Sequence, residues 1–131
     1  MDWLRAGFAF GVLAVVVSAC ASAHGPVQPL VVGWERYFAI EWEPGTRNGH
    51  PVVQGSVLND WGWPASSIQL LVEGLDPSGQ VVTQDIAWLG TPLTPGMRAY
   101  FEVPVKDPRP GYRVSVFAFN WVQSGNGADN R

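Results

Sequence analysis

Short stretches of the chain alternate between apolar and polar residues. The clearest is residues 37–43, YFAIEWE, in which Phe38, Ile40 and Trp42 fall on one side and the two glutamates on the other. A period of two residues is typical of a strand with one buried face. The same reasoning predicts further strands at residues 52–59, 68–73, 80–88, 97–105 and 112–122.

Residues that favour turns separate these stretches. Asp76-Pro77-Ser78-Gly79 is the strongest signal, because proline fixes φ at the second position and glycine tolerates a positive φ. Residues 44–49 are predicted to form a loop of the same kind. Six or seven short strands, about a dozen residues apart, predict an all-β, immunoglobulin-like antiparallel sandwich, with a small barrel as the alternative. The intervals are too short for the helices that a parallel sheet requires.

The last predicted strand, residues 112–122, is apolar on both sides. Its two rows are Phe117, Phe119 and Trp121 on one side and Val114, Val116 and Ala118 on the other. A strand covered on one side only should not be apolar on both. Three explanations remain open: the preceding segment or Trp34 covers the aromatic row, a bulge changes the facing, or the row is an interaction patch.

The chain opens with an apolar run that precedes the predicted strands. Residues 6–19 carry no charge and follow Arg5. These fourteen residues, as a helix, would span about 21 Å, less than the roughly 30 Å of bilayer hydrocarbon. The run therefore predicts a helical signal peptide over residues 1–19 rather than a membrane span.

Two cleavage sites follow this run. Val17-Ser18-Ala19-Cys20 resembles the lipobox of bacterial lipoproteins, in which the cysteine is acylated and becomes the mature N-terminus. Ala21-Ser22-Ala23 resembles an ordinary signal-peptidase site, which would leave His24 first. Cys20 is the single cysteine, so an internal disulfide is excluded and the sulfur is free to carry lipid.

Lipid attachment at Cys20 defines the expected layout and location of the protein. The signal peptide covers residues 1–19, a tether 20–34, the sandwich 35–122 and a flexible tail 123–131. The domain is then extracytoplasmic and bound to a bacterial membrane through its lipid anchor. By resemblance to lipoproteins of double-membraned bacteria, Ala21 after the cysteine favours the outer membrane, facing the periplasm.

One ordered set of short motifs resembles a known family. It begins with residues 53–59, VQGSVLN, read as V-x-G-x-V-x-N, and continues with an apolar strand and residues 76–79, DPSG. Residues 93–96, LTPG, then precede a strand with FEV, and YRVSV at 112–116 closes the series. This order resembles FxLYD-type domains of the bacterial cell envelope, which are immunoglobulin- or fibronectin-III-like sandwiches. The resemblance implies an extracytoplasmic accessory or binding module and supplies no catalytic residues.

Composition narrows the function classes. The net charge is −3 with 15% charged residues and no basic run, which argues against nucleic-acid binding. The chain has no Gly-x-Ser-x-Gly motif, no Cys–His pair and no phosphate-binding glycine loop. We therefore expect a protein that is not an enzyme and that needs no cofactor.

The loop Trp61-Gly62-Trp63-Pro64 is the most prominent candidate for binding. Exposed indoles stack on sugar rings or anchor partner proteins. The alternative is that both tryptophans cap the open end of the sandwich. Tyr112, which follows Pro110-Gly111, is a candidate tyrosine corner whose hydroxyl would bond to nearby backbone.

His24 and His50 are the only histidines. A mature N-terminus at His24 would combine an amine with an imidazole, and these nitrogens suit Cu(II). The sequence thus supports a non-catalytic envelope lipoprotein that binds a protein or glycan. A soluble periplasmic copper binder and a carbohydrate-binding module that uses Trp61 and Trp63 are the alternatives.

Overall fold

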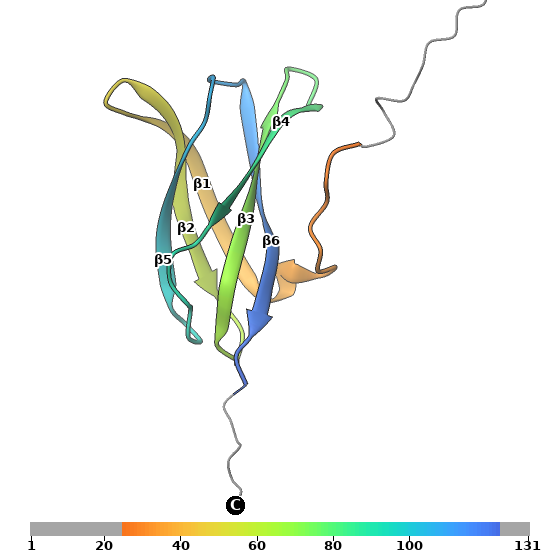
Figure 1. Cartoon of the computed structure of the whole chain (residues 1–131), viewed down its shortest axis with the longest axis vertical. Helices are drawn as coiled ribbons and strands as arrows, with labels where there is room; N and C mark the ends of the chain where they lie inside the picture. The colour runs from red at the N-terminus through yellow and green to blue at the C-terminus, as the bar shows by residue number, and fades with distance from the viewer. Residues whose placement is uncertain (1–24, 124–131) are drawn as a thin grey trace, which may run out of the picture.

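In a computed structural model, which describes residues 25–123, the chain forms six antiparallel strands (Figure 1). The expected signal helix lies outside the described residues. A short 3-10 helix, η2 (Trp34–Arg36), precedes the first strand. The strands are β1 (Phe38–Arg47), β2 (His50–Asn59), β3 (Ala65–Leu75), β4 (Val81–Trp88), β5 (Arg98–Pro104) and β6 (Gly111–Trp121).

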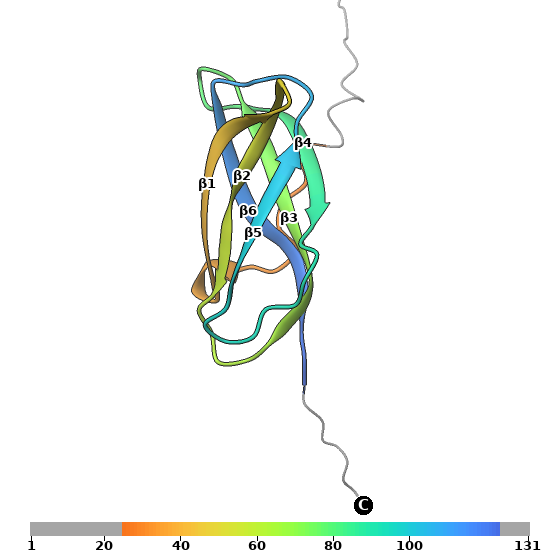
Figure 2. The ribbon, with the colours of Figure 1, turned by 90° about the vertical axis from the view of Figure 1, so that its left-hand side faces the viewer.

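The strands form two three-stranded sheets that face each other (Figures 1 and 2). Sheet A has the order β1-β2-β5 and sheet B the order β4-β3-β6. These orders correspond to strands A-B-E and C′-C-F of an immunoglobulin domain. The predicted antiparallel sandwich is confirmed. The barrel alternative is wrong, because no hydrogen-bonded ladder joins the two sheets between residues 25 and 123.

Alternate side chains of both sheets fill the core between them. Strand β3 is the central strand of sheet B and has the largest share. The aliphatic side chains of this core that are at most 2% exposed are Val53, Val57, Ala65, Ile68, Leu70, Val72, Leu93, Val114 and Val116. This arrangement follows from the period of two, which directs every second residue of a strand to the same face.

The β1–β2 hairpin is tighter than the sequence suggested. Residues 44–49 were expected to form a loop, but β1 continues to Arg47 and pairs with His50. The turn is only Asn48-Gly49, with φ of 53° and 80°. Two adjacent residues with positive φ are typical of a type I′ turn, whose twist matches the flanking strands. Pro44 is tolerated because β1 is an edge strand.

The predicted turn between β3 and β4 is confirmed. Oδ1 of Asp76 accepts hydrogen bonds from the Ser78 hydroxyl (2.7 Å) and from the backbone N–H groups of Ser78 and Gln80 (both 2.9 Å). These donors, with the Ser78 hydroxyl foremost, lower the pKa of Asp76. Gly79 has φ of 88°, the conformation for which glycine is suited.

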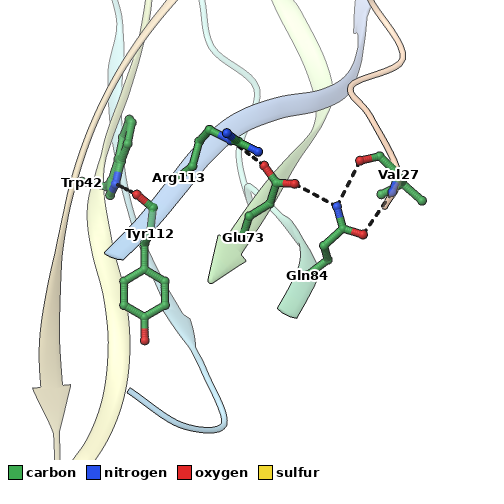
Figure 3. A network of polar contacts seen from close by, with 6 residues as sticks. All are labelled: Val27, Trp42, Glu73, Gln84, Tyr112 and Arg113. Atoms are coloured by element: carbon green, nitrogen blue, oxygen red, sulfur yellow. Dashed lines mark hydrogen bonds and ion pairs between the residues drawn. The ribbon is translucent and has the colours of Figure 1, made fainter. Parts of the chain in front are cut away.

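Tyr112 forms the expected tyrosine corner. Its hydroxyl accepts a hydrogen bond from the Arg109 N–H (2.9 Å) and donates to the Asp107 carbonyl (3.2 Å). The backbone carbonyl of Tyr112 accepts a bond from Nε1 of Trp42 (2.9 Å), as Figure 3 shows. Because Trp42 belongs to β1 and Tyr112 to β6, this bond links sheet A to sheet B.

Two irregularities in the β3–β6 pairing change the facing of β6. One extra residue lies on β3 near Ser67, which has φ of 52°, and one lies on β6 at Phe117. Val116 before the second bulge and Phe119 after it therefore both pack on the core. Phe119 and Trp121 share one face, as expected, and this face packs on the core, but Phe117 lies at the bulge and leaves the expected row. The bulge explanation is confirmed.

The segment before η2 lies against sheet B. The N–H and carbonyl of Val27 bond to the Gln84 side chain (both 3.0 Å), and the Leu30 N–H donates to the Phe117 carbonyl (2.8 Å). Gln84 is on β4 and Phe117 on β6, so the segment crosses the intervening β3. It does so on the outer face, where Leu71 is fully buried although it lies outside the core cluster. Of residues 20–34, the expected tether, residues 25–34 thus belong to the folded unit.

Candidate functional site

Aromatic side chains gather at the end of the sandwich where β1 begins and where β2 and β6 end. We call this group the aromatic end. Its members are Tyr37, Phe38, Trp61, Trp63, Phe119 and Trp121. The ring of Tyr37 lies edge-on to Trp61 (4.7 Å between centroids) and to Trp121 (5.2 Å). Edge-on pairs at such distances are favourable beyond the area that they bury.

The two loop tryptophans have a structural role and also keep exposed surface. Trp61 packs on Tyr37, and Trp63 packs on Trp121 at 6.1 Å. The rest of each indole is open to solvent, and Trp61 and Trp63 are 45% and 52% exposed, respectively. The loop therefore caps the sandwich, as one of the two interpretations held, while it presents indole surface to solvent. Trp121 is half-buried, and its ring lies edge-on to that of Trp63.

A buried asparagine holds the loop that carries these tryptophans. Asn59 is fully buried at the end of β2. Its Nδ2 donates to the carbonyls of Trp63 (2.8 Å) and Leu93 (3.0 Å), and its Oδ1 accepts from the Trp61 N–H (2.9 Å). Its backbone also pairs with Met97 and Gly96. One side chain thus fixes the backbone on both sides of the two indoles.

The burial of Asn59 could have been predicted from the sequence. Asn59 continues the inward row of Val53, Gly55 and Val57 by two residues, so its burial follows from the strand period. Glycine is required at position 55 of the same motif, because a Cβ there would overlap the Glu41 carbonyl oxygen on β1. The glycine and the asparagine of V-x-G-x-V-x-N therefore serve the packing of β1 and the loop after β2.

The outer face of sheet A carries a second feature, a shallow hollow of about 600 Å³. Glu41, Glu43 and Tyr100 are among the residues that line it. At its margin Glu102 forms a two-pronged ion pair with Arg47, with N–O distances of 2.6 and 2.7 Å. The hydrogen bonds from Arg47 lower the pKa of Glu102. Both oxygens of this carboxylate are thus already engaged by the Arg47 guanidinium.

The remaining candidates are not brought together. His50 is exposed at the start of β2, whereas His24, Cys20 and the lipobox residues Val17, Ser18 and Ala19 lie outside the described residues. Within residues 25–123, no three His, Cys, Asp or Glu side chains are grouped to hold a metal ion. In the same range, no helix is long and apolar enough to cross a membrane.

No family model, curated protein or solved structure matches this chain.

The role of Asn59 leads to a prediction about stability. Asn59→Ala removes three side-chain hydrogen bonds, one of them buried and two partly buried, so we expect a loss of about 3 kcal/mol in the free energy of unfolding. Chemical denaturation measures it. Asn120→Ala, at an exposed asparagine of β6, is the matched control and should stay close to wild type. Equal stability of the two variants would contradict the role of Asn59.

Proposed function

We propose that this protein is a non-catalytic lipoprotein of the bacterial cell envelope. In this proposal Cys20 carries the lipid, and the sandwich is a binding module whose aromatic end contacts an envelope protein or glycan. The observation that carries the proposal is the pair of half-exposed indoles, Trp61 and Trp63, on a loop whose backbone Asn59 fixes.

Rigid, half-exposed tryptophans are suited to binding. Aromatic anchors supply much of the binding energy in protein interfaces, and they stack on sugar rings. A loop that is already ordered loses little conformational entropy when a partner binds. The contacts of Trp61 with Tyr37 and of Trp63 with Trp121 keep both indoles in place before any partner arrives.

The short stretch of chain between Cys20 and Val27 supports the lipid anchor. Val27 bonds to Gln84 of β4. The lipobox-like sequence ends seven residues before Val27, at Cys20. Acylation of that cysteine would place the module directly at a membrane, and two or more acyl chains suffice for stable attachment.

The resemblance to FxLYD-type domains agrees with this proposal. The motif V-x-G-x-V-x-N occupies β2, and its glycine and asparagine have structural roles in this chain. A carbohydrate-binding module that uses the same two tryptophans is the second candidate, since the exposed indoles suit a sugar ring equally well.

Fatty-acid labelling in cells tests the anchor. The wild-type chain, produced with its leader in a bacterium, should incorporate a labelled fatty acid, and Cys20→Ser should not, because the acceptor sulfur is missing. The mass of the mature N-terminus gives an independent reading. Unlabelled wild type, or a mature chain that begins at unmodified His24, would reject the anchor and favour the copper-binding alternative.

Photocrosslinking in the same cells tests the binding surface. A photoreactive amino acid at position 63 should give a discrete adduct with an envelope protein or glycan. The same amino acid at Ser78 is the control, because the β3–β4 turn lies at the opposite end of the sandwich (Figure 1). Adducts at position 78 but not at 63 would contradict a role for the aromatic end.

A further inference from the structure

The outer face of sheet B carries exposed apolar side chains. Ile86 and Trp88 of β4 are 45% and 66% exposed, and they lie opposite Leu71 and Gln69 of β3. Val27 and Leu30, from the segment that crosses this face, are 44% and 68% exposed. We call these four residues, Val27, Leu30, Ile86 and Trp88, the apolar patch. A patch of this kind on a small domain marks a surface that another phase or molecule covers.

Charge on this face is low and balanced. The outward side chains of Glu73 and Arg113 form an ion pair at 2.8 Å, and Gln84 donates to the other carboxylate oxygen of Glu73 at 2.9 Å (Figure 3). Residues 25–33, GPVQPLVVG, add no charge. The Glu73–Arg113 pair and residues 25–33 together therefore carry no net charge.

The outer face of sheet A has the opposite character. It presents Glu41, Glu43 and Tyr100 around the hollow and the Arg47–Glu102 ion pair at its margin. Tyr100 is 80% exposed there. The outer face of sheet A thus carries mainly charged side chains, among them Arg98, which donates to the Ser56 hydroxyl. The outer face of sheet B carries one ion pair and exposed apolar side chains. An anionic membrane surface would repel the first face and accept the second.

The length of chain between the proposed anchor and the fold brings the apolar patch close to the membrane. Five residue steps separate Cys20 from Gly25, and whatever their conformation they span at most about 18 Å. Gly25 lies beside Val82 and Gln84, on the strand that carries Ile86 and Trp88. A lipid on Cys20 would therefore keep the start of β4 within reach of the bilayer. Ile86 and Trp88 follow further along the same strand, on the outer face of sheet B.

We propose that the apolar patch rests on the surface of the bilayer and fixes the orientation of the module. The proposal depends on the lipid attachment at Cys20. In this orientation Trp88 lies at the level of the lipid headgroups, where indole rings are enriched in membrane proteins. Ile86, Leu30 and Val27 are the other patch residues that face the bilayer. The lipid chains supply the attachment, and the patch supplies the orientation. The charged face of sheet A and the tryptophans of the aromatic end stay accessible to partners.

Site-directed spin labelling tests this orientation. The full chain is produced with its leader, purified as the mature protein and reconstituted in nanodiscs of phosphatidylethanolamine and phosphatidylglycerol. Acylation removes the thiol of Cys20, so a nitroxide reacts only with a newly introduced cysteine. Ile86→Cys probes the apolar patch, Trp88→Cys repeats the measurement at a second patch position, and Tyr100→Cys on sheet A is the control.

The collision rates of the label with oxygen and with a water-soluble nickel chelate distinguish the outcomes. We expect labels at 86 and 88 to be severalfold less accessible to nickel than the label at 100, and to be more accessible to oxygen. Equal nickel accessibility at all three positions would overturn the proposal while the anchor stands. A label at 86 that is shielded from both reagents, and whose spectrum is broadened by the nitroxide of a second copy of the protein, would also overturn the proposal. That result would indicate a contact between protein molecules. A mature N-terminus without lipid, read by mass spectrometry, rejects the proposed anchor and this orientation with it.

Discussion

The passage of residues 25–30 across sheet B is the contact on which the rest of the molecule depends. A three-stranded sheet at the surface leaves one face open, and on this sheet that face includes Leu71, Glu73 and Ser115. All three are nevertheless buried. Burial of a leucine side chain alone stabilises a fold by about 1.5–3 kcal/mol. Backbone hydrogen bonds hold the covering segment at two positions. The Val27 N–H donates to the Gln84 side chain, and the Leu30 N–H donates to the Phe117 carbonyl. The same crossing also places Gly25 beside the first residues of β4.

The strand period and the turn residues were enough to predict the architecture. Alternation at residues 37–43 and the Asp76–Gly79 turn act within a few residues of chain, so the sequence displays them directly. The facing of β6 could not be read in this way, because a bulge at Phe117 breaks the alternation and its position depends on the pairing with β3. The docking of residues 25–30 was missed for a similar reason. Its partners, Gln84 and Phe117, lie more than fifty residues further along the chain.

Some of the candidate binding residues could be predicted from the sequence, and others could not. Trp61 and Trp63 were recognisable as a tryptophan-rich loop, and the structure shows that they both cap the core and retain exposed surface. Asn59 was visible only as the last letter of a motif, although its burial follows from the row of Val53 and Val57. Ile86 and Trp88 resemble any other apolar strand residues in the sequence. Their exposure is apparent only when the pairing of β4 with β3 shows that they lie on the outer face of sheet B.

Amide hydrogen exchange, resolved by residue, tests the central contact most directly. If residues 25–30 form part of the folded unit, the Leu30 amide, which donates to Phe117 of β6, exchanges slowly, and the Val27 amide is also protected. Val32, which is 96% exposed in the same segment, serves as the internal reference and exchanges quickly. Exchange of Leu30 and Val27 at the rate of Val32 would contradict this account, because sheet B would then have an uncovered outer face and the exit point of the chain would not be fixed.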